Sequence, residues 1–486
     1  MPTLSFANSV RAALKGCDAA VVVAAASAFA ENALPALFDP PVQKLAVELG
    51  ALAKPGLLGG CASTLTGHDP GRLYVGVLPE TLSRYNAPSR AEGIRRVIPG
   101  DIGQYSKAAI ILILDDASHY LAAANAVGRA FPEFTAKSGD PSSLKLTIVA
   151  IDREGNAIKA TPRIKETVAT TRAVAALVDT PPTDLDPASY AKEARALLSG
   201  VKGVRIKEIV GDALVKQGLM GIHAVGRTAV SAPRLFIATY TPARGKGSDR
   251  HIALVGKGVT YDTGGLNLKI QGHMSNMKCD MGGSAAVLGA FRVLAANGCK
   301  HKVSVILCLA ENAIGPKAYK PDDVLRMHSG KTVEINNTDA EGRLCLASGV
   351  SYAARVLKAD TVIDAATLTG AQMVATGLLH GALVSNDEDL EGRFVAAGKA
   401  SGDLVHPLPF APELYKSEFE SAVADMCNSV RNRMNAQTAC AAQFVYWHIE
   451  DTGVKWAHID LAGPAFPKNR GTGFGVALIA ETVNDL

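Results

Sequence analysis

Several sequence patterns that mark common protein classes are missing from this chain of 486 residues. Its eight cysteines are scattered and no two have the Cys-x-x-Cys spacing, which indicates a reducing compartment rather than a disulfide framework. The net charge is only +4 and no block of lysines and arginines stands out, so charge does not indicate a nucleic-acid or membrane-surface partner.

Membrane and targeting signals are missing too. The apolar stretch 19–30 is too short for a membrane span, and no basic leader stands directly before it. We expect this stretch to form a strand and the start of a helix. Without a targeting segment, the predicted location is cytoplasmic.

Familiar catalytic signatures are also absent. The chain has no His-Glu-x-x-His and no Gly-x-Ser-x-Gly. Its glycine-rich stretch 255–265 is not a phosphate loop, because Gly258 follows Lys257 where Ser or Thr is required. Among the eleven histidines, His458 beside Asp460 is the most motif-like, and we interpret it as a core histidine or one that supports a neighbouring ligand. Any chemistry is therefore expected from carboxylates and lysines.

The chain is long enough for two large domains, and alternating apolar and helical patterns predict an α/β fold in both. The continuous apolar run 108–114 is typical of a strand buried on both faces. We divide the chain into an N-terminal α/β domain of unclear role at 1–165, a linker helix at 166–180 and a C-terminal domain at 181–486. Each domain is expected to contain a mixed sheet flanked by helices, and the larger one is expected to carry the catalytic site.

The stretch 337–344 (Asn-Thr-Asp-Ala-Glu-Gly-Arg-Leu) brings two carboxylates and a guanidinium together. Asp339, Glu341 and Arg343 occupy alternate positions, which face the same way in an extended backbone. A strand is expected before them and a helix from Leu344 onward, so they should lie at a strand-to-helix turn. Such turns, at the carboxyl ends of strands in an α/β sheet, are where ligands bind. A surface ion-pair cluster is the alternative interpretation.

Two further aspartates fall at comparable places. A strand at 252–256 is expected to end in a glycine-rich loop that carries Lys257 and Asp262, and Asp280 comes just before a helix at 283–296. Four carboxylates converging in a partly buried pocket would repel one another, and two divalent metal ions would neutralise them formally. Two ions bridged by a carboxylate and a water lower the pKa of that water, which becomes a hydroxide nucleophile. Taken singly, each acid could instead be a helix cap, a turn former or a solvated loop residue.

With these residues in view, the chain resembles a known family. The stretch 337–344 is similar to the signature octapeptide of the leucyl aminopeptidases, the cytosolic dinuclear metallo-aminopeptidases of the M17 type. The upstream residues fit that family's spacing: Lys257, Asp262, Lys269 and Asp280. The segments 366–371 and 457–463 also fit. The resemblance covers roughly 165–486, whereas the first domain fits only by position and α/β character.

The resemblance implies an aminopeptidase that removes N-terminal residues, preferably leucine-like, from peptides with a free N-terminus. Two divalent ions per subunit are implied, Zn²⁺ or Mn²⁺ with Mg²⁺ as a further candidate, together with bicarbonate and a homohexameric assembly. The implied metal ligands are Lys257, Asp262, Asp280, Asp339 and Glu341, with Asp262 and Glu341 bridging. Lys269 is implied to polarise the scissile carbonyl, and Arg343 to hold the bicarbonate that acts as general base. The implied substrate contacts are Met277, Asn337, Thr367, Leu368, Gly370 and Ala462.

Three segments depart from the family pattern: 313–316, 429–435 and 473–475. They bear on substrate preference, rate and subunit contacts and leave the metal set intact. Two alternatives stay open. One is a non-enzymatic scaffold or DNA-binding member of the same family, against which the modest charge and the missing basic stripe argue. The other is a two-metal phosphoesterase, which the absence of histidine ligands and of a phosphate loop disfavours.

Overall fold

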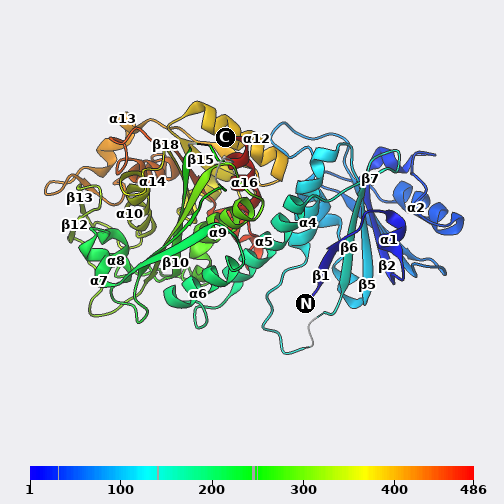
Figure 1. Cartoon of the computed structure of the whole chain (residues 1–486), viewed down its shortest axis with the longest axis horizontal. Helices are drawn as coiled ribbons and strands as arrows, with labels where there is room; N and C mark the ends of the chain where they lie inside the picture. Colours follow the sequence, from blue (N-terminus) through cyan, green and yellow to red (C-terminus); the bar gives the residue numbers. More distant parts are fainter. Residues whose placement is uncertain (31, 140–141, 244–246, 249) are drawn as a thin grey trace. The chain divides into compact units, whose positions relative to one another are not determined.

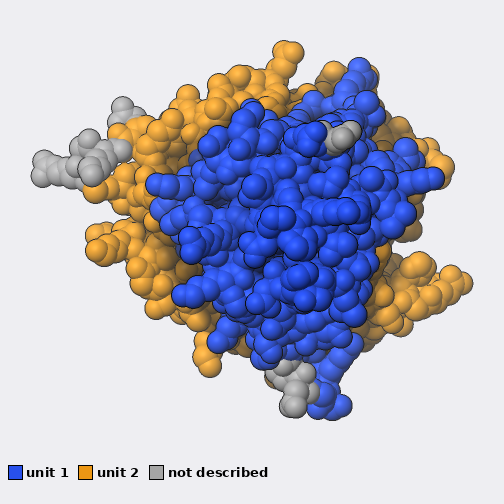
Figure 2. All heavy atoms as spheres, turned by 90° about the vertical axis from the view of Figure 1, so that its right-hand side faces the viewer, with its two compact units in different colours: residues 1–173, 398–404 blue, residues 174–397, 405–486 orange. Residues whose placement is uncertain are grey.

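The computed structural model of the chain describes residues 1–30, 32–139, 142–243, 247–248 and 250–486 (Figure 1). These residues form two compact units (Figure 2). Unit 1 contains Met1–Ala173 and Gly398–Leu404, and unit 2 contains Val174–Ala397 and Val405–Leu486. The main division falls inside helix α5 (Pro162–Asp179), where we expected a linker helix. The assignment of separate roles to the three sequence segments stays a prediction.

Unit 1 is built on a sheet in the order β1-β6-β5-β2-β4-β3, with β7 paired to β6. The strands are β1 (Thr3–Phe6), β2 (Ala19–Ala25), β3 (Gly60–Leu65), β4 (Arg72–Leu78), β5 (Lys107–Ile113), β6 (Lys145–Ile151) and β7 (Ala157–Ile158). Among the strands described for this unit, the pairings of β3 with β4 and of β7 with β6 are antiparallel and the others are parallel. The predicted strand at 108–114 is confirmed as β5, which is buried along nearly its whole length because helices cover both faces.

The helices of unit 1 lie on both faces of its sheet. They are α1 (Val10–Leu14), α2 (Pro40–Leu52), α3 (Ala91–Val97) and α4 (Tyr120–Ala130), with short 3₁₀ turns η1 (Ala26–Phe29), η2 (Gly100–Gln104) and η3 (Ala117–His119). Helices α1 and α2 pack with one core cluster, and α3 and α4 with the other. The stretch 19–30 is a strand followed by the 3₁₀ turn η1, and not the start of an α-helix.

Unit 2 is larger and its main sheet has the order β16-β15-β18-β14-β10-β11-β9-β8. The strands are β8 (Val204–Val210), β9 (Arg234–Tyr240), β10 (His251–Asp262), β11 (Lys302–Asn312), β14 (Thr361–Ala366), β15 (Gly381–Ser385), β16 (Val405–Pro407) and β18 (Lys455–Asp460). A small separate sheet joins β12 (Val324–Arg326), β13 (Thr332–Glu334) and β17 (Met426–Cys427). Both units therefore have mixed sheets flanked by helices, as the sequence predicts.

The helices of unit 2 also cover both faces of the main sheet (Figure 1). Helices α6 (Pro187–Leu197), α9 (Gly282–Ala296), α12 (Glu388–Ser401) and α16 (Val476–Asp485) contribute to one core cluster. Helices α7 (Asp212–Lys216), α8 (Met220–Gly226), α10 (Gly342–Arg355) and α14 (Gln437–Tyr446) contribute to the other. The remaining short elements are α11 (Gly370–Thr376), α13 (Pro412–Tyr415), α15 (Ala462–Ala465), η4 (Met277–Met281), η5 (Lys416–Phe419) and η6 (Pro467–Asn469).

One apolar segment, Met277–Ala296, has the length and composition of a membrane span. It consists of η4 and α9, and 83% of its apolar window is buried inside the protein. Its buried residues, among them Leu288 and Phe291, belong to the core cluster that packs on the main sheet. The composition of this segment is thus that of a core helix covering a sheet.

The strands β11, β10, β14 and β18 are consecutive parallel neighbours at the centre of the main sheet. Their carboxyl ends therefore meet at one edge. Asn312 ends β11, Asp262 ends β10, and Asp460 ends β18. This edge of the sheet is where the predicted site residues gather.

Candidate active site

A hollow of about 650 Å³ opens at the carboxyl ends of the central parallel strands. All the residues that the sequence proposes for metal, catalysis and substrate line it: Lys257, Asp262, Lys269, Met277, Asp280, Asn337, Asp339, Glu341, Arg343, Thr367, Leu368, Gly370 and Ala462. They come from segments that are far apart in the chain, from Lys257 to Ala462. Their convergence makes a single site possible, while the role of each residue stays a prediction.

Lys257 and Asp262 belong to a strand, and the prediction of a glycine-rich loop there is wrong. Strand β10 runs from His251 through Asp262. Residues five positions apart in a regular strand face opposite sides of the sheet. Between Val259 and Asp262, however, β10 has one more residue than β11, which is a β-bulge. The extra residue brings Asp262 round to the face of Lys257, so both side chains reach the hollow.

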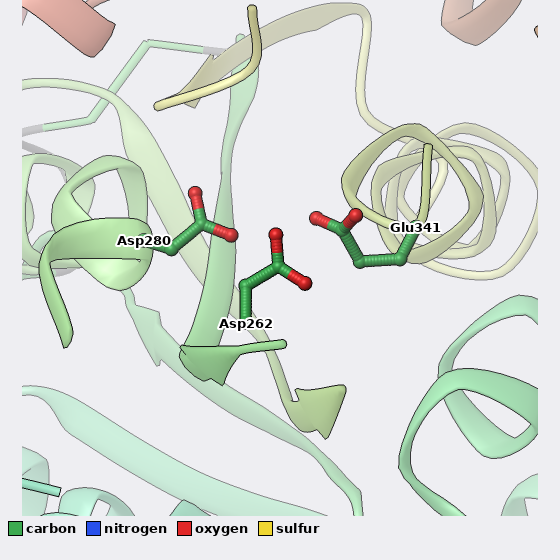
Figure 3. Close-up of side chains that lie close together, drawn as sticks. All are labelled: Asp262, Asp280 and Glu341. Carbon is green, nitrogen blue, oxygen red and sulfur yellow. The ribbon is translucent and has the colours of Figure 1, made fainter. Parts of the chain in front are cut away.

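Three carboxylates meet in the hollow, and Figure 3 shows them pointing toward one another. One oxygen from each of Asp262, Asp280 and Glu341 lies within 4.8 Å of the other two. All three side chains are buried. Asp280 Oδ2 and Glu341 Oε2 have no hydrogen-bond partner among the described residues, although a buried carboxylate oxygen without one is costly.

The stretch 337–344 is not extended, so our prediction of three side chains on one strand face is wrong in its geometry. Thr338 and Asp339 form a turn, and Glu341 has helical backbone angles at the start of α10. The strand-to-helix transition is confirmed, with α10 beginning at Gly342. A Cβ at Gly342 would lie 2.6 Å from Lys257 Cε. The glycine therefore leaves room for the Lys257 side chain to pass the first residue of α10. Asp339, Glu341 and Arg343 still line one hollow.

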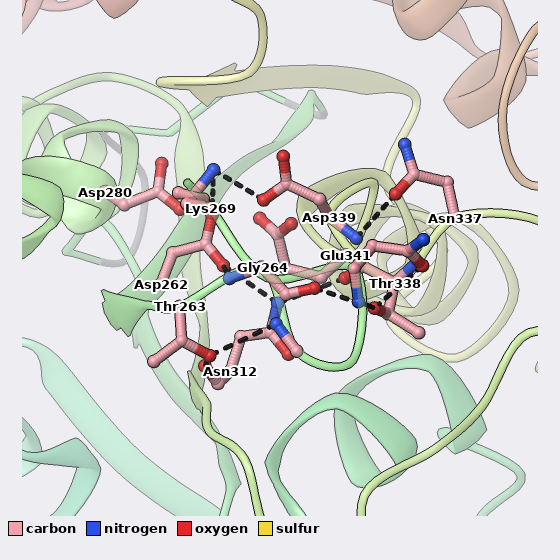
Figure 4. A network of polar contacts seen from close by, with 12 residues as sticks. Asp262, Thr263, Gly264, Lys269, Asp280, Asn312, Asn337, Thr338, Asp339 and Glu341 are labelled. Atoms are coloured by element: carbon pink, nitrogen blue, oxygen red, sulfur yellow. Dashed lines mark hydrogen bonds and ion pairs between the residues drawn. The ribbon is translucent and has the colours of Figure 1, made fainter. Parts of the chain in front are cut away.

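Two lysines, Lys257 and Lys269, neutralise the carboxylates, and Figure 4 shows Lys269 between Asp262 and Asp339. Lys257 Nζ lies 2.7 Å from Asp280 Oδ1 and 2.9 Å from Glu341 Oε1, and it donates to the Thr367 carbonyl at 2.9 Å. Lys269 Nζ lies 2.8 Å from Asp262 Oδ2 and 2.5 Å from Asp339 Oδ1. Each lysine therefore occupies the space between two expected metal ligands.

The pKa values of the site residues reflect burial and mutual repulsion. Burial and the Glu341 carboxylate raise the pKa of Asp262 to about 6. Burial also raises the pKa of Asp280 and of Asp339 above the ordinary range. Although burial acts on Glu341 too, Lys257 and Lys269 hold its pKa below the ordinary value. These groups store electrostatic free energy that a bound cation would release.

The donor set fits divalent metal ions. It offers carboxylate oxygens, which Mg²⁺, Mn²⁺ and Zn²⁺ all accept. Two of these buried oxygens have no hydrogen-bond partner in the part of the chain that the structure describes. Four acids, Asp262, Asp280, Asp339 and Glu341, match the formal charge of two divalent ions. Lys257 is held among them, and its amine can ligate a metal only when it is neutral. The carboxylates raise the pKa of Lys257 against the effect of burial, so a metal must displace its proton.

Arg343 is a buried cation that has no carboxylate partner within the described part of the chain. Its side chain is about 5% exposed and Nη1 donates to the Asn428 carbonyl at 3.0 Å. Nε has no hydrogen-bond partner among the described residues, and burial lowers the pKa of the group to about 10. A guanidinium in this state can accept a small planar anion through two parallel hydrogen bonds.

Several residues that sequence reasoning missed hold the ligand segment in place. Asn312 Nδ2 donates to Asp262 Oδ1 at 2.8 Å and to the Thr338 carbonyl at 3.1 Å. Tyr319 donates to that same carbonyl at 2.6 Å. The fully buried Asn428 accepts from the backbone N–H groups of Asn336 and Asn337, and its amide donates to the carbonyls of Asn337 and Ala340. Such contacts orient ligands before a metal binds.

The segment 367–370 is fixed by Asp460. Asp460 Oδ1 accepts from the Leu368 N–H at 3.1 Å, and Oδ2 accepts from the Thr369 hydroxyl at 2.7 Å. The Thr367 hydroxyl donates to Asp280 Oδ1 at 2.8 Å, which ties this segment to a proposed metal ligand. Asp460 lies in the segment 457–463 that fits the family pattern, and its position at the end of a central strand is a further signal for a role in the site.

His458 is fully buried and its Nδ1 lies 2.5 Å from Asp364 Oδ1. Asp364 also accepts from Trp456 Nε1 at 2.7 Å. His458 does not line the hollow, so the prediction of a core histidine is confirmed. Of the three divergent segments, 429–435 reaches the hollow through Ser429 and Arg433.

Comparison with known proteins gives a consistent match. The model of the cytosol aminopeptidase family catalytic domain (Peptidase M17) matches residues 172–480, and the model of M17 aminopeptidase N-terminal domain 2 matches residues 62–140. Probable aminopeptidase NPEPL1 of Mus musculus is 43% identical over 413 residues, which cover 83% of this chain and 78% of that protein. Leucine aminopeptidase 1 of Caenorhabditis elegans is 42% identical over 409 residues, covering 83% and 82%.

Solved structures agree along nearly the whole chain. Leucyl aminopeptidase from Trypanosoma brucei in complex with bestatin superposes with a TM-score of 0.89 at 34% identity, covering 99% of this chain and 95% of that one. The bottromycin maturation enzyme BotP in complex with Mn superposes with a TM-score of 0.78 at 28% identity, covering 97% and 99%.

Proposed function

The chain belongs to the cytosol aminopeptidase family and is a hydrolase of the exopeptidase class, and from this premise we propose a two-metal aminopeptidase that prefers leucine-like N-terminal residues. The observation that carries the proposal is the meeting of the buried carboxylates of Asp262, Asp280 and Glu341. Two of them keep an oxygen with no hydrogen-bond partner among the residues described. Asp339 and Lys257 complete the proposed set of ligands. Asp262 and Glu341 would bridge the ions, Lys257 and Asp280 would complete one site, and Asp339 the other.

When bound, two divalent ions, zinc, manganese or magnesium, would supply Lewis acidity and a water of lowered pKa. The chain's own contribution begins with Lys269. Its ammonium lies in the hollow, and the Asp262 and Asp339 carboxylates raise its pKa against the effect of burial, so it stays protonated. A cation fixed there can stabilise the negative charge that develops on the scissile carbonyl oxygen. Lys269 is therefore proposed as the electrophilic residue.

Arg343 is proposed to hold bicarbonate, which would act as the general base. Support comes from its burial, from its unpartnered Nε and from its anchoring to the Asn428 carbonyl. The anchor fixes the plane of the guanidinium, so two donors stay oriented toward a small anion. The residue itself moves no proton in this proposal; it positions the group that does.

The substrate is proposed to bind by its free amine, with the Leu368 carbonyl as acceptor. The N–H of Leu368 is held by Asp460, so the peptide plane that presents this carbonyl is fixed. Met277, Gly370 and Ala462 line the same hollow and offer an apolar surface for the first side chain. Asn337 accepts the Asp339 N–H at 2.9 Å and is proposed to touch substrate at the rim. An internal peptide bond offers no free amine, so cleavage would remove one residue at a time.

The direct test is hydrolysis of leucine p-nitroanilide and leucinamide by the purified chain after loading with Mn²⁺ or Zn²⁺. We expect activity together with about two metal ions per chain by elemental analysis. Inactivity of the fully loaded protein on both substrates would overturn the proposal. Release of phosphate from phosphate esters without amide hydrolysis would support the phosphoesterase alternative. Salt-sensitive retention on DNA without hydrolysis would support the scaffold alternative.

Two finer properties rest on the family resemblance. We propose a cytoplasmic location, which the names of several cytosol aminopeptidase relatives support. We also propose a homohexamer. Sedimentation of the purified protein tests the assembly, and a stable monomer at micromolar concentration would contradict it.

A further inference from the structure

A second hollow of about 660 Å³ adjoins the proposed active site. The two share Gly370, Arg433 and Gln437 in their linings, so they are continuous. The rest of the second lining is mostly apolar: Ala371, Val374, Ala375, Leu408, Pro409 and Met434. We call this second hollow the apolar recess. Val374 and Met434 are each 91% exposed, so the recess has surface available for a ligand side chain.

Arg433 stands where the two hollows meet and differs from the other cations there. Lys257 and Lys269 are engaged by carboxylates, and Arg343 is buried against the Asn428 carbonyl. Arg433 is exposed, and among the described residues it has neither an ion-pair partner nor a hydrogen bond. Its charge is near enough to Arg343 to act on that guanidinium, lowering its pKa. A cation at the junction is thus available to an incoming anion.

The neighbouring Arg431 provides a contrast within the same loop. Arg431 Nη2 donates to the Glu420 carbonyl at 3.0 Å and Nη1 lies 3.6 Å from Glu420 Oε2. It lines neither hollow. The loop therefore carries one arginine held by the protein and one directed to the site.

A short peptide carries a free amine at one end and a free carboxylate at the other, and it could place the amine in the active-site hollow and the carboxylate near Arg433. If its amine is held deep in the active-site hollow, its chain leads outward, and each extended residue adds about 3.3–3.6 Å. A di- or tripeptide then brings its terminal carboxylate to the rim, whereas a longer peptide or an amidated one brings no charge there. The apolar recess beside the rim would take the side chain that follows the scissile bond.

We propose that Arg433 binds the C-terminal carboxylate of di- and tripeptides while the apolar recess holds the side chain after the scissile bond. Arg433 would thereby make this chain selective for short free peptides. The inference rests on the proposed aminopeptidase function and adds the length and terminal charge of the substrate. Because the ion pair would be partly exposed, its contribution is modest, roughly a 3- to 10-fold gain in kcat/KM.

The experiment compares Leu-Leu with Leu-Leu-amide on the metal-loaded enzyme. Both substrates present the same amine, the same scissile bond and the same second side chain. The measured quantity is kcat/KM for Leu-Leu divided by kcat/KM for Leu-Leu-amide. We expect this ratio to fall about 3- to 10-fold in Arg433→Ala. In Arg433→Glu it should fall further, so that the amide becomes the better substrate. Arg433→Lys should keep part of the preference. Arg431→Ala removes the same kind of charge two residues earlier in the loop, at most about 7 Å of extended chain away. This variant should keep the wild-type ratio.

The outcomes separate this inference from the function on which it rests. If the loaded wild type cleaves neither substrate, the proposed function fails. If it cleaves both and Arg433→Ala keeps the wild-type ratio, the assignment to Arg433 is overturned. An equal drop in Arg431→Ala would show a general effect of loop charge and would also overturn it. Raising the salt concentration should shrink the wild-type ratio, because a partly exposed ion pair is screened.

Discussion

Lys269 offers the sharpest test of the proposed chemistry, through the substitution Lys269→Met. The side chain is 15% exposed and its ammonium contacts Asp262 and Asp339, two of the proposed ligands. Methionine keeps much of the length and removes the charge. If Lys269 stabilises the developing oxyanion, its loss should lower kcat about 10²–10³-fold, or about 2.7–4 kcal/mol of transition-state stabilisation.

The effect of Lys269→Met on metal binding should be small, because two consequences oppose each other. The ammonium competes with a metal for Asp262 and Asp339, so removing it favours the metal. Lys269 also lowers the pKa of Asp262, so removing it makes that carboxylate easier to protonate and disfavours the metal. We expect these two effects to cancel so nearly that the metal affinity changes by less than about tenfold, or about 1.4 kcal/mol.

The assay combines kcat on leucine p-nitroanilide with elemental analysis of the same sample. Lys207→Met on the edge strand β8 is the matched control, since it removes an exposed lysine from unit 2 outside the hollow. A Lys269→Met protein that loses its metal ions would refute the electrophile role and make the residue part of the metal site. A near-normal kcat with metal retained would show that no charge is needed at this position.

Three further predictions concern other parts of the site. Asp262→Ala should lose both metal ions by elemental analysis and nearly all activity, yet stay folded by circular dichroism, because it removes a carboxylate whose pKa is raised by burial and by Glu341; retention of two ions would contradict the bridging role. Arg343→Met should abolish any stimulation of kcat by added bicarbonate, and a stimulation equal to wild type would refute the anion site. Burial alone would lower the pKa of His458, but the Asp364 carboxylate raises it above its ordinary value. The charged pair therefore stabilises the fold below the unfolded pKa of about 6.5, and this contribution is lost as pH rises through the folded pKa. His458→Asn should cost about 1.5–3 kcal/mol at pH 6 and less at high pH in denaturant titrations; a cost that grows with pH would show the sign to be wrong.

The gathering of the candidate residues in one hollow could be predicted from sequence better than the backbone that carries them. Lys257 lies between Gly256 and Gly258, a composition that normally marks a loop. The structure shows another reason for glycine at position 256, where a Cβ would lie 2.4 Å from the Cα of Ser284. Close packing of helix α9 on β10 requires the glycine, and local composition cannot distinguish that requirement from a turn.

Residues that act through tertiary contacts left no local signal. Asn428 bonds to a segment 88–92 residues earlier in the chain, and Asn312 reaches Asp262 across 50 residues. Each follows or ends a strand, and only the assembled sheets bring it to its partner. Arg433 fell within a segment recognised as unusual, but its place between two hollows depends on α11 and the loop at 408–409 folding against it.

The bulge in β10 sets stability and activity against each other when a residue is deleted from this strand. Removing one residue between Val259 and Asp262 would let β10 pair regularly with β11, and the sheet alone would gain from that repair. The same deletion would turn the Asp262 carboxylate to the opposite side of the sheet, away from Glu341 and Asp280. A design procedure that idealises backbones would therefore produce a better strand and an inert protein, and a deletion scan along β10 should find activity lost where thermal stability is kept.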